Sequence, residues 1–305
     1  MLIYTLKRLG LAVLVTISVS FVSFMLIRVS GDPAIALAGE GASQEEIEFV
    51  RVQYGFDRPL IVQYIEWAGR ALHGDLGESP YLNQPVAGML KERMGVTMTL
   101  GISALTFAMI LAIPLGVLAA IRPNTWIDRI ALAISVMGQA MPSFWFGLIM
   151  IIFFGVYLRW LPISGSDTWK HFLMPTVALG YYATPAIMRL VRSGMLEVLA
   201  SDHIRTSRAK GLRWPKILFK HALRNAIIPV VAVAAVQLGF MLGGSIVIES
   251  VFALNGLGNL AWVSISRSDL PVVQAIVLML ATIYVFLTFV SDLINAFLDP
   301  RIRNM

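Results

Sequence analysis

Six stretches of mostly apolar residues recur along the chain, and each is close to the length of a membrane-spanning helix. They cover residues 9–27, 97–121, 130–158, 172–191, 228–248 and 272–293. Because a helix needs about 20 apolar residues to cross a bilayer, the pattern predicts an all-α polytopic membrane protein with six transmembrane helices. The third stretch is long enough to tilt or to include an interfacial turn. The fourth is the weakest, because Pro175 and Pro185 interrupt it.

The first apolar stretch could also belong to a signal peptide, with two basic residues before it and residues 36–38 as a cleavage site. However, the apolar run is longer than that of a signal peptide, and Arg28 and Asp32 separate it from the candidate site. We therefore expect an uncleaved transmembrane helix.

Lysine and arginine are concentrated in four of the connecting segments. Segments 1–8, 122–129, 189–224 and 299–305 hold 15 of the 24 basic residues, whereas the alternate segments 30–95, 159–171 and 249–271 hold 8. Since basic loops of membrane proteins face the cytoplasm, we expect both termini to be cytoplasmic. The net charge of +6 then reflects membrane topology, and no nucleic-acid partner is expected.

The composition agrees with a membrane protein and excludes several kinds of chemistry. Charged residues make up 14% of the chain, against about 25% in a typical soluble domain. The absence of cysteine excludes disulfides, thiolate metal sites and cysteine nucleophiles, and the four histidines lack metal-ligand spacing. No Gly-Lys dipeptide occurs, so the chain has no phosphate-binding loop. We expect no catalytic residue, metal or cofactor in this chain.

The segment after the first span, residues 30–95, is long and acidic, and two short helices are expected in it. Ser43 and Glu46 have the spacing of a capping box at the start of the first helix. Pro59 precedes the second, which ends near Leu72. The segment could be a folded cap on the outer face or a docking surface for an outside partner.

The segment 189–224 carries nine basic residues and has the pattern of a helix, a glycine turn and a second helix. Ser201 or Asp202 can cap the first helix, and Gly211 can supply the left-handed turn that ends it. Pro215 suits the first position of the second helix. The basic residues of that helix recur at every fourth position and so share one face: Lys216, Lys220 and Arg224. This unit could lie against anionic lipid or dock as a rigid body into a groove of a soluble partner.

Seven stretches, in order along the chain, share the sequence pattern of one family. They are residues 31–33, 141–145, 202–212, 221–229, 249–258, 269–274 and 298–301. Together they resemble dipeptide/oligopeptide ABC transporter permeases, the inner membrane components of binding-protein-dependent transport systems. The long outer segment after the first span is similar to that of the first of the two permeases in such systems.

The resemblance implies a type I ABC importer permease fold with a cytoplasmic coupling helix, which seats in a cleft of an ATPase subunit. ATP binding would close the ATPase pair and move the seated helices, switching the spans from inward-facing to outward-facing. Ser207 stands where the family usually has alanine, and it is small enough for docking to survive. The implied docking residues are Asp202, Ile204, Arg205, Thr206, Ser207, Arg208, Ala209, Lys210, Gly211 and Leu212.

The implied function is that of a permease subunit of an ATP-driven importer, which forms half of the path for di- or oligopeptides. The implied partners are a second homologous permease, two ATP-binding subunits, an extracytoplasmic solute-binding protein and membrane lipid. The implied location is the bacterial inner membrane. A nickel chelate, glutathione or an oligosaccharide could be the cargo instead, and an ATP-independent channel or secondary carrier is the alternative of a different class.

The expected organisation has four parts. Residues 1–29 form the N-terminal transmembrane helix, and residues 30–95 form the extracytoplasmic segment. Residues 96–298 hold the ABC importer transmembrane domain, with five helices and the coupling loop 192–228. Residues 299–305 are the cytoplasmic tail.

Three polar residues inside the spans could line the path or hydrogen-bond between helices: Gln139, Ser143 and Gln237. Gly239 and Gly243 form a small-xxx-small pair typical of close helix packing, possible also against a second permease.

Asp292 is a carboxylate inside the last span and could relay protons. Its position near the cytoplasmic end favours pairing with Arg301 or Arg303 instead.

Overall fold

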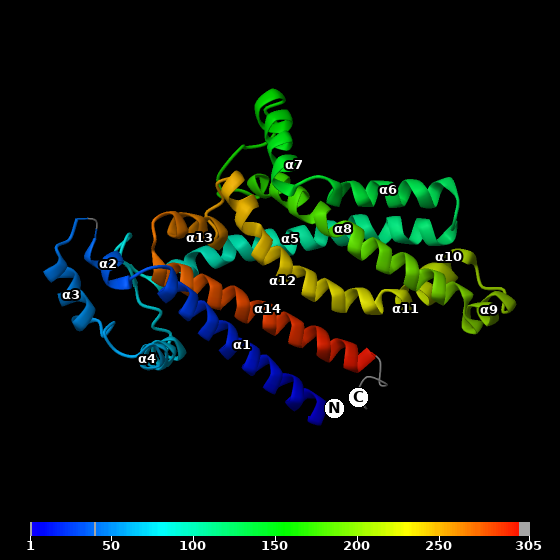
Figure 1. Ribbon diagram of the computed structural model, residues 1–305. Helices are drawn as coiled ribbons and strands as arrows, with labels where there is room; N and C mark the ends of the chain where they lie inside the picture. The colour runs from blue at the N-terminus through cyan, green and yellow to red at the C-terminus, as the bar shows by residue number, and fades with distance from the viewer. Residues whose placement is uncertain (1, 40, 299–305) are drawn as a thin grey trace.

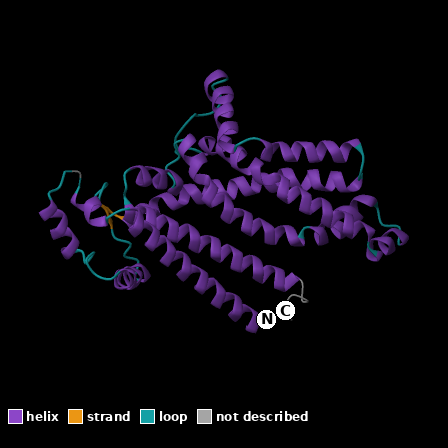
Figure 2. Ribbon diagram, viewed as in Figure 1, coloured by secondary structure: helices purple, strands orange, loops and turns teal. Residues whose placement is uncertain are grey.

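The computed structural model describes residues 2–39 and 41–298 (Figure 1). Most of this part of the chain is helical (Figure 2). Two short strands in it, β1 (Glu78–Ser79) and β2 (Gln84–Pro85), pair antiparallel. The prediction of an all-α architecture is confirmed.

Five long helices run along the bundle (Figure 1): α1 (Leu2–Ser30), α5 (Val86–Ile121), α8 (Trp169–Ala200), α12 (Ile228–Val251) and α14 (Leu270–Leu298). The shorter α6 (Trp126–Ala140) packs against α5 and α8. The main core lies between α5 and α8, where a row of alanines on α5 faces larger apolar side chains of α8. Its fully buried members include Ala104, Ala108 and Ala112 of α5, and Ile187, Val191 and Met195 of α8.

Glycines let α5 and α8 approach closely. A Cβ atom added at Gly180 of α8 would lie 2.4 Å from the carbonyl oxygen of Ala104. A Cβ atom added at Gly116 of α5 would lie 2.9 Å from the carbonyl oxygen of Met188. Small residues at such crossings allow the van der Waals contacts that hold helices together in lipid.

The number of spans is the point at which the fold departs from expectation. Among the described residues, four helices are long and apolar enough to cross a membrane, namely α1, α5, α12 and α14. A fifth span requires α6 to be joined with α7 (Ser143–Met150) and the π-helix η1 (Ile151–Tyr157), although these two parts meet at 96°. The count of six is therefore not confirmed.

The third predicted span is broken between α6 and α7. Met141 has extended backbone angles, φ −111° and ψ 137°, as expected of a residue that precedes proline. Pro142 then starts α7, which projects away from the bundle (Figure 1). The sequence allowed a turn in this stretch, but the structure turns the chain through nearly a right angle.

The fourth predicted span lies within α8, which continues unbroken through Pro175 and Pro185. At 1.5 Å per residue its 32 residues extend for about 48 Å, so its length suffices to span. It is less apolar than the other long helices because it carries charged residues towards its ends, namely Lys170, Arg189, Arg192 and Glu197. Pro185 removes the helical partner of the Tyr181 carbonyl, and this carbonyl lies against Gly138 of α6.

The two ends of the bundle differ in structure (Figure 1). One end holds the start of α1, the end of α14 and the short helix α9 (Asp202–Ala209). The opposite end holds α2 (Pro33–Ala38), α3 (Gln44–Gln53) and α4 (Leu60–Leu72). We call them the α9 end and the α4 end.

The helices of the acidic segment begin and end as the sequence predicts. Ser43 Oγ accepts a hydrogen bond from the Glu46 N–H at 3.3 Å, and Glu46 Oε2 accepts one from the Ser43 N–H at 2.7 Å. The capping box is confirmed, and its hydrogen bonds from Ser43 lower the pKa of the Glu46 carboxyl. Helix α4 packs on α1 through Tyr64, whose hydroxyl lies 2.7 Å from Ser20 Oγ.

Two expectations about side-chain partners need correction. Asp292 pairs with Arg8 of α1 at 2.9 Å, a contact that the sequence did not suggest, while Arg301 and Arg303 lie outside the described residues. Gly239 packs inside the chain against the Tyr284 ring of α14, whereas Gly243 is exposed with open space around it. The two glycines therefore do not act as one packing pair within the chain.

Candidate coupling surface

Helix α9 is a separate short helix that is anchored to the core by apolar side chains. Ile204 is fully buried, and the half-buried Leu212 packs against the same core cluster. After the turn, the chain continues through α10 (Trp214–Lys216), the π-helix η2 (Ile217–Leu223) and α11 (Arg224–Ala226). The predicted helix, turn and helix are all present.

Gly211 ends α9 in the predicted left-handed turn, with φ +73°. The Gly211 N–H donates to the Arg208 carbonyl at 2.9 Å, and the Leu212 N–H donates to the Ser207 carbonyl at 3.3 Å. These two bonds are those of a Schellman motif, in which an apolar residue after the glycine packs back onto the structure. Leu212 fills that role, so the turn and the anchor form one rigid unit.

The remaining predicted docking residues face outward with one exception. The exposed ones are Asp202, Arg205, Thr206, Arg208, Ala209, Lys210 and Gly211. Ser207 is half-buried, and its hydroxyl donates to the His203 carbonyl at 2.8 Å. Ile204 and Leu212 were expected at a docking surface, but they face the core of the chain itself.

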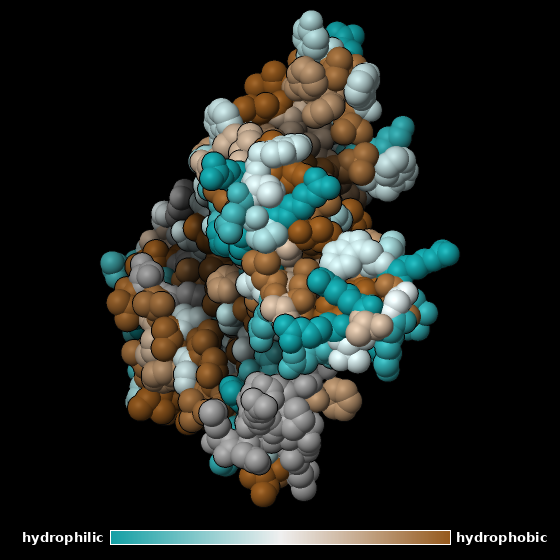
Figure 3. Space-filling model, turned by 90° about the vertical axis from the view of Figure 1, so that its right-hand side faces the viewer, coloured by the Kyte–Doolittle hydropathy of each residue, from teal (hydrophilic) through white to brown (hydrophobic). Residues whose placement is uncertain are grey.

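The second helix of the unit is less regular than expected, because seven of its residues form a π-helix. This segment buries Ile217, Leu218 and Ala222, while the predicted basic side chains are all exposed: Lys216, Lys220 and Arg224. Figure 3 views the molecule from the α9 end and shows hydrophilic side chains gathered there beside hydrophobic ones. The exposed basic side chains of α9 and of the helix after it give this end of the molecule a strongly basic surface.

A buried ion pair near the α9 end joins α6 to α8. Arg192 donates from Nε to Asp128 Oδ1 at 2.8 Å and from Nη2 to Oδ2 at 2.7 Å. The Asn124 N–H also donates to Asp128 Oδ2, at 2.9 Å. Such two-point contacts fix geometry as well as adding energy. Since α8 leads directly into α9, the pair connects the chain just before α9 to α6. Sequence inspection did not find this pair.

A second buried carboxylate, Glu249 of α12, organises the α4 end. It is fully buried, and its Oε1 accepts from the hydroxyls of Thr97 at 2.8 Å and Ser245 at 2.9 Å. Its Oε2 accepts from the N–H groups of Gly258 at 2.7 Å and Asn259 at 3.1 Å. These N–H groups belong to the first turn of α13 (Leu257–Ser266), where a carboxylate is favoured by the helix dipole.

The Glu249 cluster gives a structural reason for two residues of the stretch 249–258, which is part of the family pattern. A Cβ atom added at Gly256 would lie 2.2 Å from Glu249 Oε2, so only glycine fits there beside the carboxylate. The carboxylate and the glycine therefore act together to fix α13 to α12. The sequence showed both residues, but it gave no sign of their contact with Thr97.

Comparison with known proteins decides the family. Residues 112–304 match the family described as "Binding-protein-dependent transport system inner membrane component". Residues 1–101 match the N-terminal family of the same transport systems. The chain belongs to this family. The predicted resemblance is confirmed.

Similar proteins support the family assignment over the whole length of the chain. It is 39% identical over 304 residues to the "Glutathione transport system permease protein GsiC" of Escherichia coli O6:H1, with 99% of each chain covered. It is 38% identical to the protein of that name from Escherichia coli K12, again covering 99% of each chain. These relatives are permease subunits of transporters and not enzymes.

A solved structure supports the fold. The permease is similar to a chain of the MetNI methionine ABC transporter in an inward-facing conformation, with a TM-score of 0.57 and 24% sequence identity. The match covers 69% of this chain and 96% of that chain. The family match and the GsiC relatives identify the chain as an ABC importer permease embedded in a membrane, and permeases of this kind work with an ATPase and a binding protein.

The residues proposed for the path lie on three different helices. Gln139 is exposed at the end of α6, Ser143 is half-buried at the start of α7, and Gln237 is half-buried in α12. Within the described ranges, none of the three side chains makes a hydrogen bond. Their role in the path stays a prediction.

Proposed function

We propose that this permease forms half of the translocation path of an ATP-driven importer in the bacterial inner membrane. A second homologous permease would form the other half, and two ATP-binding subunits would drive the pair. A solute-binding protein would deliver the cargo at the α4 end. The family membership and the absence of a phosphate-binding loop in the sequence support this division of labour.

Helix α9 is the proposed contact with an ATP-binding subunit. The observation that carries this proposal is the division of its side chains: Ile204 is buried in the core, while the polar and basic residues are exposed. An anchored helix with a Schellman turn moves as a rigid body, as a coupling element must. The Asp128–Arg192 pair supports the idea that its motion reaches α6.

The α9 end is proposed to be cytoplasmic, with both termini on that side. The support is the excess of basic residues in the segments that this orientation places inside. The chain has no cysteine, so a single introduced thiol reports its own side of the membrane. In intact cells, an impermeant maleimide should label Ser266→Cys on α13 and leave Thr206→Cys unlabelled; the reverse result would invert the topology.

The proposed cargo is a di- or oligopeptide. The support is that the relatives named above are glutathione permeases, since glutathione is itself a tripeptide. Uptake of labelled glutathione and of a labelled dipeptide into vesicles holding the complete transporter would separate these substrates. A transporter that takes up an oligosaccharide or a nickel chelate, but neither peptide, would show the proposed cargo to be wrong.

The coupling role is tested by replacing Gly211 in the complete transporter. Valine at positive φ costs on the order of 1–3 kcal/mol of backbone strain, so the Schellman turn should be lost. We expect uptake and association with the ATPase to fall in Gly211→Val. Asparagine tolerates this conformation, and Gly211→Asn should keep most of both activities. Wild-type uptake and association in Gly211→Val would show that α9 does not couple, and uptake without ATP would indicate a channel or carrier.

A further inference from the structure

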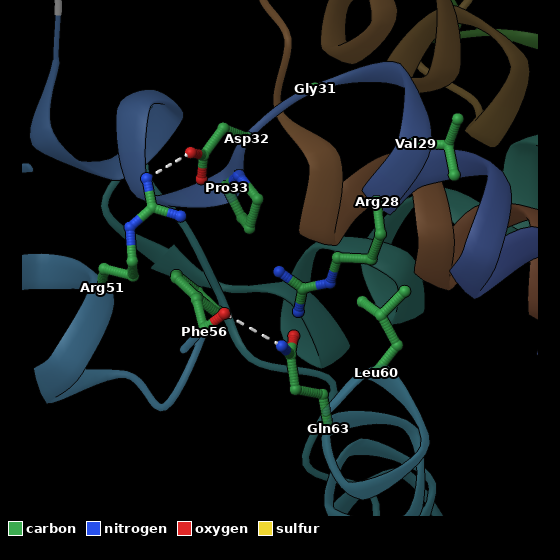
Figure 4. A pocket seen from close by; sticks show the side chains of 9 residues that line it. All are labelled: Arg28, Val29, Gly31, Asp32, Pro33, Arg51, Phe56, Leu60 and Gln63. Atoms are coloured by element: carbon green, nitrogen blue, oxygen red, sulfur yellow. Dashed lines mark hydrogen bonds and ion pairs between the residues drawn. The ribbon is translucent and has the colours of Figure 1, made fainter. Parts of the chain in front are cut away.

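A hollow of about 320 Å³ opens where α1 ends, beneath the helices of the α4 end (Figure 4). The side chain of Arg28 points into it, between Phe56 and Gln63 (Figure 4). Its lining comes from the end of α1, the start of α2, α3, the following loop and α4: Arg28, Val29, Gly31, Asp32, Pro33, Arg51, Phe56, Leu60 and Gln63.

The guanidinium of Arg28 is held by aromatic rings, while its hydrogen-bonding capacity is left unused. Its central carbon lies 5.0 Å from the centroid of the Phe24 ring and 4.6 Å from that of Phe56. Rings interact with the faces of a guanidinium, whereas its N–H groups point outward in its plane. Nε and Nη1 are buried and have no hydrogen-bond partner in the part of the chain that the structure describes.

The charge of the nearby carboxylate, Asp32, acts on Arg28, but both of its oxygens are hydrogen-bonded to other groups. Asp32 Oδ1 accepts from the Ala34 N–H at 2.9 Å, and Oδ2 accepts from Arg51 Nη2 at 2.6 Å. Arg51 and Asp32 therefore form a neutral pair, and the hollow keeps the positive charge of Arg28. A buried charge without a hydrogen-bonded partner is costly. Gln63 Oε1 is also buried without a partner in the described part of the chain, but as a neutral acceptor it would leave the charge of Arg28 in place.

The hollow lies just beyond the apolar span of α1, where the headgroups of a bilayer around that span are expected. The apolar span of α1 runs over Ile3–Leu26 and ends two residues before Arg28. Helix α4 is seen nearly end-on in Figure 1, so it crosses α1 as a helix lying in the membrane plane would. Ile61, Ile65 and Leu72 form an exposed apolar stripe on α4, which is typical of an interfacial helix.

We propose that Arg28 binds the phosphate of a phospholipid headgroup in this hollow. The buried N–H groups would turn toward the phosphate oxygens, and the acyl chains would follow the exposed apolar side chains of α1. Those side chains include Phe21, Val22 and Leu26. The lipid would thereby tie α2, α3 and α4 to the end of the first helix.

The test is native mass spectrometry of the purified full-length chain, titrated with phosphatidylglycerol or with a diacylglycerol of the same acyl chains. Arg28→Gln removes charge-assisted hydrogen bonds, so it should lower the affinity of the tightest phosphatidylglycerol site by about tenfold. The matched control is Arg58→Gln, since Arg58 lies in the same segment and is half-exposed in a pair with Glu66 at 2.6 Å. It should bind as wild type does, and diacylglycerol should bind weakly throughout.

Several results would overturn the proposal. Equal binding of phosphatidylglycerol by Arg28→Gln and wild type would exclude Arg28, and equal binding of diacylglycerol would exclude the phosphate. Displacement of the lipid by inorganic phosphate at the same concentration would indicate a site for free anions. Arg28→Gln with unchanged lipid binding but weaker capture of the solute-binding protein would assign the site to a protein carboxylate. If Arg28→Gln fails to fold, Arg28→Lys keeps the charge with fewer donors and should give an intermediate loss.

Discussion

The two ends of this permease use charged groups in opposite ways. At the α4 end, the Glu249 carboxylate is fully buried and accepts four hydrogen bonds from groups of the same chain. At the α9 end, the basic residues of α9 and of the helix after it point into solvent. The Glu249 arrangement is complete within the chain, whereas we propose that the exposed basic surface around α9 is completed by a partner. The comparison indicates that the Glu249 carboxylate serves the architecture of the permease, while the exposed charges around α9 are those we propose to serve its assembly.

The largest effect should come from removing the carboxylate at the α4 end. Glu249→Ala leaves buried donors on α5, α12 and α13 without an acceptor, and it opens a cavity. By analogy with breaking a buried ionic contact, we expect the free energy of unfolding to fall by about 3–5 kcal/mol. A thermal melt of the purified chain in detergent checks this. Glu197→Ala removes an exposed carboxylate of α8 and should melt as wild type does.

A smaller loss of stability is expected near the α9 end, where Asp128→Asn would break the pair with Arg192. The Asp128 side chain is only 4% exposed and that of Arg192 is 24% exposed, so the loss should be about 2 kcal/mol. The same melt measures it. If Asp128→Asn proved more damaging than Glu249→Ala, the contrast between the self-contained Glu249 cluster and the partner-dependent surface around α9 would be wrong.

The smallest effect should follow from separating α1 and α14 at their exposed contact. Arg8 and Asp292 are 39% and 24% exposed, and such pairs contribute about 0–1 kcal/mol. Arg8→Gln should therefore change the melting temperature little, and added salt should have a similarly small effect in the wild type. A large destabilisation by Arg8→Gln would show that α1 depends on this contact for its position.

Local features of the fold were readable from the sequence, since they depend on neighbouring residues. Ser43 and Glu46 form the predicted capping box, and Gly211 adopts the predicted left-handed turn. The apolar stretches also located the long helices. In each case the physical cause acts over a few residues, such as a cap, a positive φ or a continuous apolar run.

Features that depend on distant packing were not readable. Thr97 and Glu249 are far apart in sequence, and the pairing of Arg8 with Asp292 requires α1 and α14 to lie side by side. Pro142 signalled a break, but the 96° bend depends on where α7 packs. The inward direction of Ile204 likewise follows from the core that receives it.

The central claim, that α9 is the contact for an ATP-binding subunit, is tested most directly by one accessibility measurement. Thr206 is exposed on α9 and Ser266 is exposed on α13, at the other end of the bundle. Single-cysteine variants at these positions are labelled with a maleimide in detergent, with and without the ATP-binding subunits. Binding of the subunits should slow the labelling of Thr206→Cys and leave Ser266→Cys unchanged. Unchanged labelling of Thr206→Cys in a complex that demonstrably contains the subunits would contradict the account.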